Sequence, residues 1–233
     1  MNTSKTLHKN VPVQLSDEQF SARHSRVLPS PLHQATVGQL LGDGHADRSS
    51  PTSNTRLSWS FGAAFSSYAN FISGLYALYC NTGFKSVGVR AKKGGDTLSN
   101  YRLKTVTLPI FNIYHDMFYV FDATANKYMK IVPSDIKELM SPITLAHLIM
   151  GDGNYDEGRN RVRIYTNSFT HADCLLLAEA ITSMGITTQV MKDKVGKDGS
   201  VQYVLTIGAL QLGTLRECVG PHMDSSMLYR IGL

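Results

Sequence analysis

The sequence of 233 residues contains only three cysteines, and no apolar run in it is long enough to cross a membrane. Because Cys80, Cys174 and Cys218 are odd in number and far apart, we expect them to be reduced and buried, without a disulfide framework. Serine, glycine or a charged residue interrupts every apolar run well before the roughly 18 residues that a membrane helix needs. The eight histidines and the cysteines also lack the spacing of a zinc site. These absences argue against a disulfide scaffold, a membrane protein and a zinc protein.

The balance of residue types is that of a globular protein with a mildly basic surface. Hydrophobic residues make up 42% of the chain and charged residues 18%, which argues against disorder. The net charge of +5 at pH 7 is compatible with a polyanionic partner but does not establish one. Residues 1–30 are polar and aperiodic, so we predict a flexible N-terminal arm there. The start of the chain lacks the apolar centre of a secretory signal.

The stretch LLGDGHAD at residues 40–47 has a near copy, LIMGDGNYD, at residues 148–156. Residues 32–43 and 142–152 have helical spacing, and Gly44 and Gly153 are placed to end the two helices. Strand and helix patterns then follow in the same order in both halves. They lie at 55–61, 66–80, 85–91, 101–108 and 109–121 in the first half, and at 161–167, 171–185, 187–193, 202–208 and 210–220 in the second. A repeat of this length predicts two copies of one subdomain related by a pseudo-twofold axis.

The predicted fold is α+β, with two pseudo-symmetric αββαββα subdomains that each form a curved antiparallel sheet. We expect the domain limits to be as follows: an arm at 1–30, a first subdomain at 31–126, a linker at 127–141 and a second subdomain at 142–233. Small residues in the two Gly-Asp-Gly helices would allow their backbones to approach closely. These residues are Gly38, Gly42, Ala146 and Gly151.

Close packing of these helices would bring Asp43 and Asp152 together. An aspartate in the last turn of a helix faces the negative end of the helix dipole, which is unfavourable unless a cation compensates. Two carboxylates so placed predict a hard-oxygen site for an ion such as Mg²⁺. Two-metal sites of this kind stabilise the attacking and leaving oxygens of a phosphodiester.

The sequences TVGQLLGDG (36–44) and LAHLIMGDG (145–153) resemble the two signature helices of a single-chain LAGLIDADG homing endonuclease. The flanking sequences KIVP, YTNSF and PHMDSSMLYRI are similar to the organellar, intron-encoded branch of that family. The resemblance covers residues 32–233. It implies a monomer in which two packed LAGLIDADG helices join the subdomains and the sheets form a DNA-binding saddle.

The resemblance also implies an activity, a cofactor and a location. The activity is site-specific, divalent-metal-dependent hydrolysis that makes double-strand breaks across the minor groove of a long asymmetric DNA target. The implied cofactor is Mg²⁺, with Mn²⁺ or Ca²⁺ able to substitute for binding. The implied partner is double-stranded DNA, and the implied location is the mitochondrion. Two alternatives stay open: an RNA maturase that binds its own intron RNA, and a DNA-binding protein or nickase with impaired cleavage.

The resemblance assigns roles to residues at matching positions. The metal-binding acids are Asp43 and Asp152, with the carbonyls of Gly42 and Gly151 as further metal ligands. The supporting basic residues are Lys130 in KIVP and Arg230 in MLYR, where lysine is usual. A water-positioning residue matches Asn167 in the second half, whereas Phe61 or Gly62 stands at that place in the first. The mismatch points to unequal cleavage of the two strands, and His147 occupies a motif position that is usually small.

Strand alternation predicts which side chains face the DNA, because a two-stranded ribbon fits the major groove and one sheet face is free to lie along it. In the first half these residues are Arg56, Ser58, Ser60, Arg90, Lys92, Arg102 and Lys104. In the second half they are Arg161, Arg163, Tyr165, Lys192, Lys194 and Tyr203. Arginine forks suit guanine edges, whereas lysines mostly meet phosphate.

Overall fold

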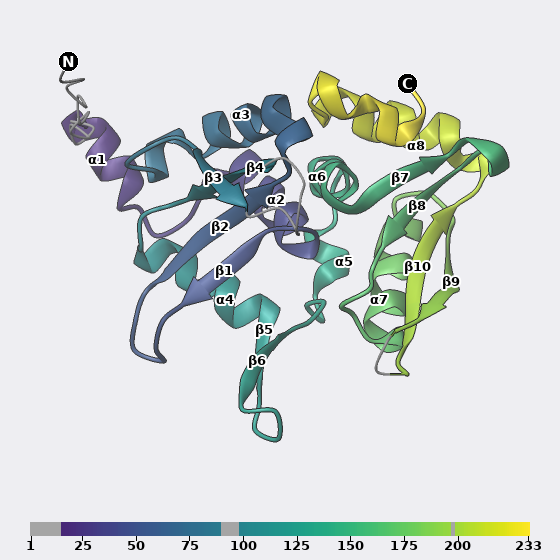
Figure 1. Cartoon of the computed structure of the whole chain (residues 1–233), viewed down its shortest axis with the longest axis horizontal. Helices are drawn as coiled ribbons and strands as arrows, with labels where there is room; N and C mark the ends of the chain where they lie inside the picture. The colour runs from purple at the N-terminus through teal and green to yellow at the C-terminus, as the bar shows by residue number, and fades with distance from the viewer. Residues whose placement is uncertain (1–14, 90–97, 197–198) are drawn as a thin grey trace, which may run out of the picture.

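The structure is a computed structural model that describes residues 15–89, 98–196 and 199–233. Two four-stranded antiparallel sheets lie on either side of a central helix pair, α2 (Ser30–Leu41) and α6 (Pro142–Asp152) (Figure 1). The predicted α+β fold of two αββαββα subdomains is confirmed. None of the helices within the described ranges has the length and apolar character needed to span a bilayer.

The two halves share one strand order, β1-β2-β4-β3 in the first sheet and β7-β8-β10-β9 in the second. The first half contains β1 (His45–Arg48), β2 (Thr55–Phe61), α3 (Ser66–Leu75), β3 (Lys85–Val89), β4 (Leu98–Lys104) and α4 (Asn112–Phe118). The second contains β7 (Gly153–Asp156), β8 (Arg161–Tyr165), α7 (His171–Thr182), β9 (Thr188–Val195), β10 (Val201–Ile207) and α8 (Leu212–Val219). Short 3-10 segments lie at Ala63–Phe65, Ala77–Tyr79, Pro109–Phe111, Glu157–Arg159, Ala209–Gln211, Gly220–His222 and Ser225–Ile231. Identical strand order in both sheets is the outcome that an internal repeat predicts.

Alternation along the strands decides which sheet face is covered. In β2 the side chains of Leu57, Trp59 and Phe61 are buried, whereas the residues between them lie on the opposite face. Trp59 packs against Tyr76 with ring centroids 4.5 Å apart. Burying such aromatic and aliphatic side chains supplies most of the favourable free energy of folding. One face of each sheet is thereby fixed against helices, and the other remains available.

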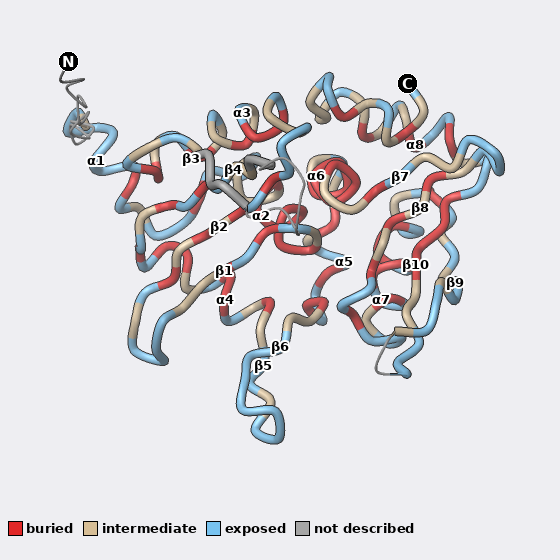
Figure 2. Tube along the Cα trace, in the orientation of Figure 1, coloured by how far each residue is buried: buried red, intermediate tan, exposed pale blue. Residues whose placement is uncertain are grey.

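The central helices pack with close backbone contact, as their small residues predict. A Cβ atom added at Gly38 would lie 2.2 Å from the carbonyl oxygen of Thr144, which no real side chain could tolerate. Most residues of both helices are buried, and the tube in Figure 2 is red there. His147 does not disturb this packing: its ring stacks on Phe71, and its Nδ1 atom lies 2.9 Å from the side-chain nitrogen of Gln39.

The sequence-based boundaries are wrong at one place between the two halves. Residues 109–121 were expected to be one helix, but α4 ends at Phe118 and a hairpin follows, β5 (Tyr119–Asp122) and β6 (Lys127–Lys130). The Asp122 side chain accepts the backbone N–H groups of Thr124 and Ala125, and Asn126 has a left-handed φ of 48°. These are ordinary turn signals. The predicted boundary at 126/127 therefore falls inside the hairpin, which projects from the body in Figure 1. A short helix, α5 (Ile136–Leu139), leads into α6.

The predicted flexible arm at 1–30 is ordered over the part that the structure describes. Helix α1 (Asp17–Arg23) begins with a capping box between Ser16 and Gln19. At its end the buried Arg23 side chain donates to the carbonyl oxygens of Leu78 and Cys80, at 2.6 and 3.3 Å. A buried guanidinium with carbonyl partners fixes this helix to the first subdomain.

Candidate active site

Asp43 and Asp152 meet at the ends of the central helices. Helix α2 ends at Leu41, Gly42 is its C-cap, and Asp43 is the next residue. Asp152 is the last residue of α6. A Cβ atom at Gly42 would lie 3.2 Å from Oδ2 of Asp152, and one at Gly151 would lie 3.5 Å from the backbone nitrogen of Asp43. A side chain at Gly42 would press on the Asp152 carboxylate, whereas one at Gly151 would make ordinary van der Waals contact with Asp43, so the two motif ends lie directly against each other.

A cation accompanies each motif. The Nζ atom of Lys130 donates to the carbonyl oxygens of Gly42 and Gly44, at 2.7 and 2.9 Å. An Nη atom of Arg230 donates to the carbonyl oxygen of Gly153 in the other motif. The two cations therefore occupy corresponding places on the pseudo-symmetric halves, although they come from different segments. The Gly42 carbonyl, expected as a metal ligand, has Lys130 as its partner here.

Burial shifts the protonation of these groups. The pKa of Asp152 is raised to about 7, first by desolvation and then by the Asp43 carboxylate, while Lys130 and Arg230 oppose the rise. Burial also raises the pKa of Asp43, against the lowering effect of the same cations and of His45. Desolvation lowers the pKa of Lys130 to about 8. Two acids with raised pKa values and a lysine that titrates near neutral pH are typical of a functional site.

These groups open into a cleft of about 470 Å³. Its walls include Asp43, Asp152, Lys130 and the predicted water-positioning residue Asn167. The cleft also contains residues that sequence reasoning missed: His45, Tyr119, Lys127, Tyr128, Met129 and Ser168. His45 lies two residues after Asp43, and Ser168 directly follows Asn167. This closeness to predicted site residues is a signal in the sequence that both line the cleft. The hairpin residues have no such signal, because the sequence pattern predicts a helix through residue 121 and a linker from residue 127.

Of the described residues, neither Phe61 nor Gly62, the first-half matches of Asn167, lines the cleft. Phe61 is buried and makes an edge-to-face contact with Tyr68, so its side chain points into the core. Gly62 has no side chain, and neither residue lines the cleft. The sequence-level mismatch is thus a real difference between the two halves.

The free sheet faces lead into this cleft. Tyr165 on β8 and His45 on β1 both line it. Every second residue from these two along the strands has its side chain on the same free face. Most of the predicted DNA-facing residues lie on these faces: Arg56, Ser58, Ser60, Arg102, Lys104, Arg161, Arg163, Tyr165 and Lys194. Arg90 and Lys92 fall outside the described residues.

Two predicted DNA-facing residues lie on the helix-covered face instead. Tyr203 shares parity with the buried Leu205 and stacks on His171 of α7, with ring centroids 4.4 Å apart. Lys192 is directly opposite Tyr203 in the ladder, so it takes the same face. Counting the period of two from Leu205 would have placed both correctly.

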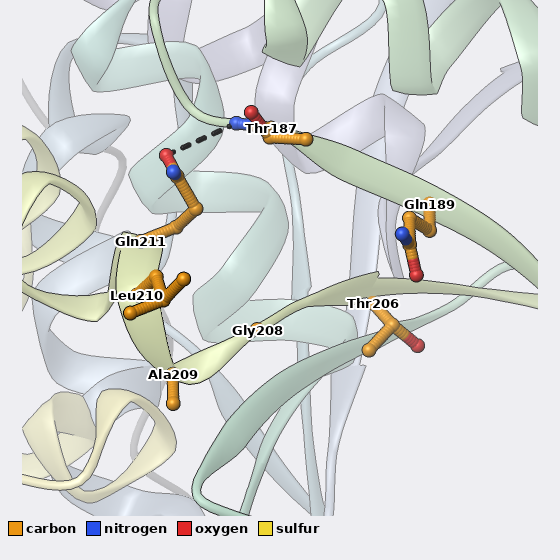
Figure 3. Close-up of a pocket in the computed structure, with 7 residues that line it drawn as sticks. All are labelled: Thr187, Gln189, Thr206, Gly208, Ala209, Leu210 and Gln211. Atoms are coloured by element: carbon orange, nitrogen blue, oxygen red, sulfur yellow. Dashed lines mark hydrogen bonds between the residues drawn. The ribbon is translucent and has the colours of Figure 1, made fainter.

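A second hollow, of about 330 Å³, lies at the far end of β10 (Figure 3). Its lining residues are Thr187, Gln189, Thr206, Gly208, Ala209, Leu210 and Gln211. The Gln211 side chain accepts the backbone N–H of Thr187 at 3.2 Å, the dashed line in Figure 3. None of these side chains titrates, so this hollow offers no acid–base chemistry.

The donor set at the helix ends fits a hard divalent cation. Over the ranges that the structure describes, no cluster of three or more His, Cys, Asp or Glu side chains could hold a metal. The two facing carboxylates and the nearby carbonyls supply oxygen alone, which suits Mg²⁺, Mn²⁺ or Ca²⁺ better than a soft metal. A cation between the carboxylates would also offset the Asp43 charge, which after desolvation is the second cause of the raised pKa of Asp152.

Comparisons with known proteins agree with this geometry. The sequence pattern of the LAGLIDADG DNA endonuclease family matches residues 33–214. DNA endonuclease I-ChuI of Chlamydomonas applanata is 24% identical over 202 residues, covering 83% of this chain and 91% of that protein. The cytochrome b mRNA maturase bI2 of Saccharomyces cerevisiae is 26% identical over 199 residues, covering 84% of this chain and 46% of the maturase. The chain thus spans less than half the length of that relative.

Among solved structures, the homing endonuclease I-WcaI bound to its DNA recognition sequence has the same fold. Its TM-score is 0.76 at 16% sequence identity, and the match covers 94% of this chain and 95% of that one. At this identity the likeness establishes the arrangement of the two subdomains and leaves the residue roles to the site itself.

Proposed function

Because the chain belongs to the LAGLIDADG DNA endonuclease family, we propose that it is a site-specific homing endonuclease. It makes double-strand breaks in a long asymmetric DNA target and depends on a divalent cation, Mg²⁺. The observation that carries the proposal is the meeting of Asp43 and Asp152 at the ends of two packed helices, with Lys130 and Arg230 on the adjoining carbonyls.

The two aspartates and the motif carbonyls are the groups that would hold the cation. When bound, Mg²⁺ would supply positive charge that stabilises the attacking and leaving oxygens of the phosphodiester. Lys130, whose pKa of about 8 lies near the working pH, can exchange a proton at Nζ. The Arg230 guanidinium can offset negative charge that develops on the phosphate. Asn167 supplies an amide at the cleft wall that can orient water.

The DNA would lie along the free faces of both sheets. Arg56, Arg102, Arg161 and Arg163 give these faces the positive charge and the forked donors that bases and phosphates attract. The pseudo-twofold axis would place two half-sites on either side of the cleft, so that one scissile phosphate comes to each motif. The single chain therefore acts as a monomer.

A plasmid cleavage assay tests the proposal. Purified protein is incubated with plasmids that carry the intronless form of the host gene, with Mg²⁺, with Ca²⁺, or with EDTA. One discrete linear product that requires Mg²⁺ is the expected result. Sequence-specific binding without any cut in Mg²⁺ or Mn²⁺ would overturn the nuclease assignment.

An RNA maturase on the same fold is the second candidate. The cytochrome b mRNA maturases bI2 of Saccharomyces cerevisiae and Debaryomyces hansenii, each 26% identical to this chain, favour it. These relatives also support a mitochondrial location. Binding of the chain to its own intron RNA, with faster splicing in vitro and no DNA cut, would make this the primary function.

A further inference from the structure

Three arginines on the free sheet faces each form an ion pair with an aspartate from another strand of the same sheet. The pairs are Arg56 with Asp47, Arg161 with Asp156, and Arg163 with Asp193. In the first two pairs the partners stand directly opposite in the ladder, so they share the free face. The third pair spans β8 and β9, across the intervening strand β10.

Arg163 is the most firmly fixed of the three. One Nη atom donates to Oδ1 of Asp193, and the other lies 3.4 Å from the hydroxyl oxygen of Tyr165. The guanidinium also lies over the Tyr165 ring, 5.1 Å from its centroid. Asp193 sits between Lys192 and Lys194, where the ladder of β9 and β10 is irregular. A β-bulge changes the direction of a side chain, and here it allows Asp193 to reach Arg163.

The other two pairs are more exposed but similar in kind. Arg161 donates through Nε to Oδ2 of Asp156 at 2.9 Å, and this bond lowers the pKa of the Asp156 carboxyl. Arg56 Nε lies 3.6 Å from Oδ2 of Asp47, which also accepts the Ser58 hydroxyl at 2.7 Å. Because both arginines meet their aspartate through Nε, by a hydrogen bond in Arg161 and an ion pair in Arg56, their Nη donors can meet a further acceptor.

These aspartates are unfavourable on a surface that meets DNA, because a carboxylate repels phosphate. An exposed ion pair also adds little to folding stability. Other cations of the same faces have no carboxylate partner among the described residues, as Arg102, Lys104 and Lys194 show. The acids therefore distinguish two classes of cation: arginines held in one orientation, and free cations that can follow the phosphate backbone.

We propose that Asp47, Asp156 and Asp193 are positioning residues for specificity, which hold Arg56, Arg161 and Arg163 toward base edges and away from phosphates. The inference rests on the proposed function. A guanidinium whose orientation is fixed can direct its remaining N–H donors at a base edge such as guanine O6 or N7, whereas a free one also binds any nearby phosphate. Each pair would thus set the preference at one base pair of the target.

Asp193→Asn tests the inference, because asparagine keeps the shape and removes the charge. Affinity is measured for the target duplex found by plasmid cleavage, for an unrelated duplex, and for targets with single base-pair substitutions. We expect the variant to bind the unrelated duplex more tightly and to lose roughly 10-fold of its discrimination at one G·C pair. The salt dependence of non-specific binding should steepen by about 0.9 in log–log slope, as for one added phosphate contact.

Glu179→Gln is the matched control. It removes the same charge from an exposed ion pair with Lys137, on α7 and away from the free sheet face. Its base preferences and salt slope should equal those of the unmodified protein. Thermal melts establish that both variants are folded.

The outcomes separate the inference from the function on which it rests. If the unmodified protein shows no preferred DNA sequence, the proposed endonuclease function fails. If it does prefer one sequence and Asp193→Asn keeps the same discrimination at every position, the positioning role is wrong. If Glu179→Gln changes discrimination as much as Asp193→Asn does, net charge alone explains the effect and the inference is overturned.

Discussion

At the scale of single residues, the chemistry depends on how burial changes ordinary side chains. Asp152 and Lys130 would both be fully charged at neutral pH in water, yet in the cleft their pKa values are about 7 and about 8. Desolvation is the largest cause for both, and the opposite charges nearby only partly restore the ionised forms. The site is therefore poised to exchange a proton for a metal ion near the physiological pH.

Replacing one aspartate should separate binding from cleavage. Asp152→Asn removes a proposed metal ligand, so we expect no detectable double-strand cleavage in Mg²⁺, while affinity for the target is kept or increased because less negative charge faces the phosphates. Gel shift and plasmid assays measure the two properties. Asp135→Asn, an exposed acid at the start of α5, is the control and should cut normally. Full activity of Asp152→Asn would refute the metal assignment.

The same variant should alter stability with a definite sign. Because the folded-state pKa of Asp152 lies above its ordinary value of 3.8, the folded protein binds more protons between about pH 4 and 7. The contribution of this group to stability therefore falls as pH rises through that window and is constant above it. Asp152→Asn should be more stable than the unmodified protein at pH 8, by roughly 1–3 kcal/mol. Equal unfolding free energies at pH 8 would contradict the burial of this carboxyl.

Protons and metal should compete at the cleft. At limiting Mg²⁺ the cleavage rate is expected to rise as pH increases through about 7, since the Asp152 carboxyl must ionise to bind a cation. Raising the Mg²⁺ concentration should move the midpoint of this profile to lower pH. A midpoint that does not move with Mg²⁺ would show that another group controls the rate.

At the scale of secondary-structure elements, the contact between α2 and α6 holds the site together. Gly38 has no room for a side chain beside Thr144, and its neighbour Gln39 bridges His147 and the hydroxyl of Tyr68 with hydrogen bonds of 2.9 and 2.8 Å. Satisfied buried polar groups fix the register of the two helices. That register decides how far apart Asp43 and Asp152 stand.

Gly38→Ala should therefore damage the protein far more than helix propensity suggests. The new methyl group would overlap the Thr144 carbonyl, so we expect a loss of roughly 3 kcal/mol in unfolding free energy and slower cleavage. Denaturant unfolding with a plasmid assay measures both. Gly74→Ala in α3 is the control: nothing lies within 4 Å of its added Cβ, so it should be neutral or stabilise by up to about 1 kcal/mol. Similar stability of the two variants would refute the close helix contact.

At the scale of the whole molecule, the two halves share one fold but place different side chains beside their motifs. Lys130 contacts the first motif and Arg230 the second, and Asn167 lines the cleft whereas Phe61 and Gly62, its first-half matches, do not. Lysine and arginine differ in geometry and in their ability to exchange protons. The two motifs are therefore accompanied by different basic side chains.

Removing one cation at a time should convert the protein into a nickase. Lys130→Met and Arg230→Met are each expected to leave nicked circular plasmid as the main product, because each affects the motif that it contacts. End-labelled duplexes should show that the two variants nick opposite strands. Lys137→Met, an exposed lysine on α5, is the control and should give linear product. Equal slowing of both strands by either variant would contradict the division of labour.

The sequence by itself determined the repeat, the two aspartates and most of the free sheet faces, because these follow from short-range periodicity. Period two in β2 separates Leu57 and Trp59 from Arg56 and Ser58. The same period of two, counted from the buried Leu205, also puts Tyr203 on the helix-covered face. The expectation that Tyr203 faces DNA therefore misread a pattern that the sequence does contain. The hairpin was missed because apolar residues continue from α4 through Phe121 without interruption, and this hid the turn at Asp122.

Only the tertiary structure decided how residues distant along the chain act on one another. No local pattern says that Lys130 reaches the carbonyls of the first motif, or that Asp193 holds Arg163 across an intervening strand. The pKa values of Asp152 and Lys130 likewise depend on burial and on charges supplied by both halves. Such effects arise from desolvation and from distances through space, and these quantities exist only once the chain has folded.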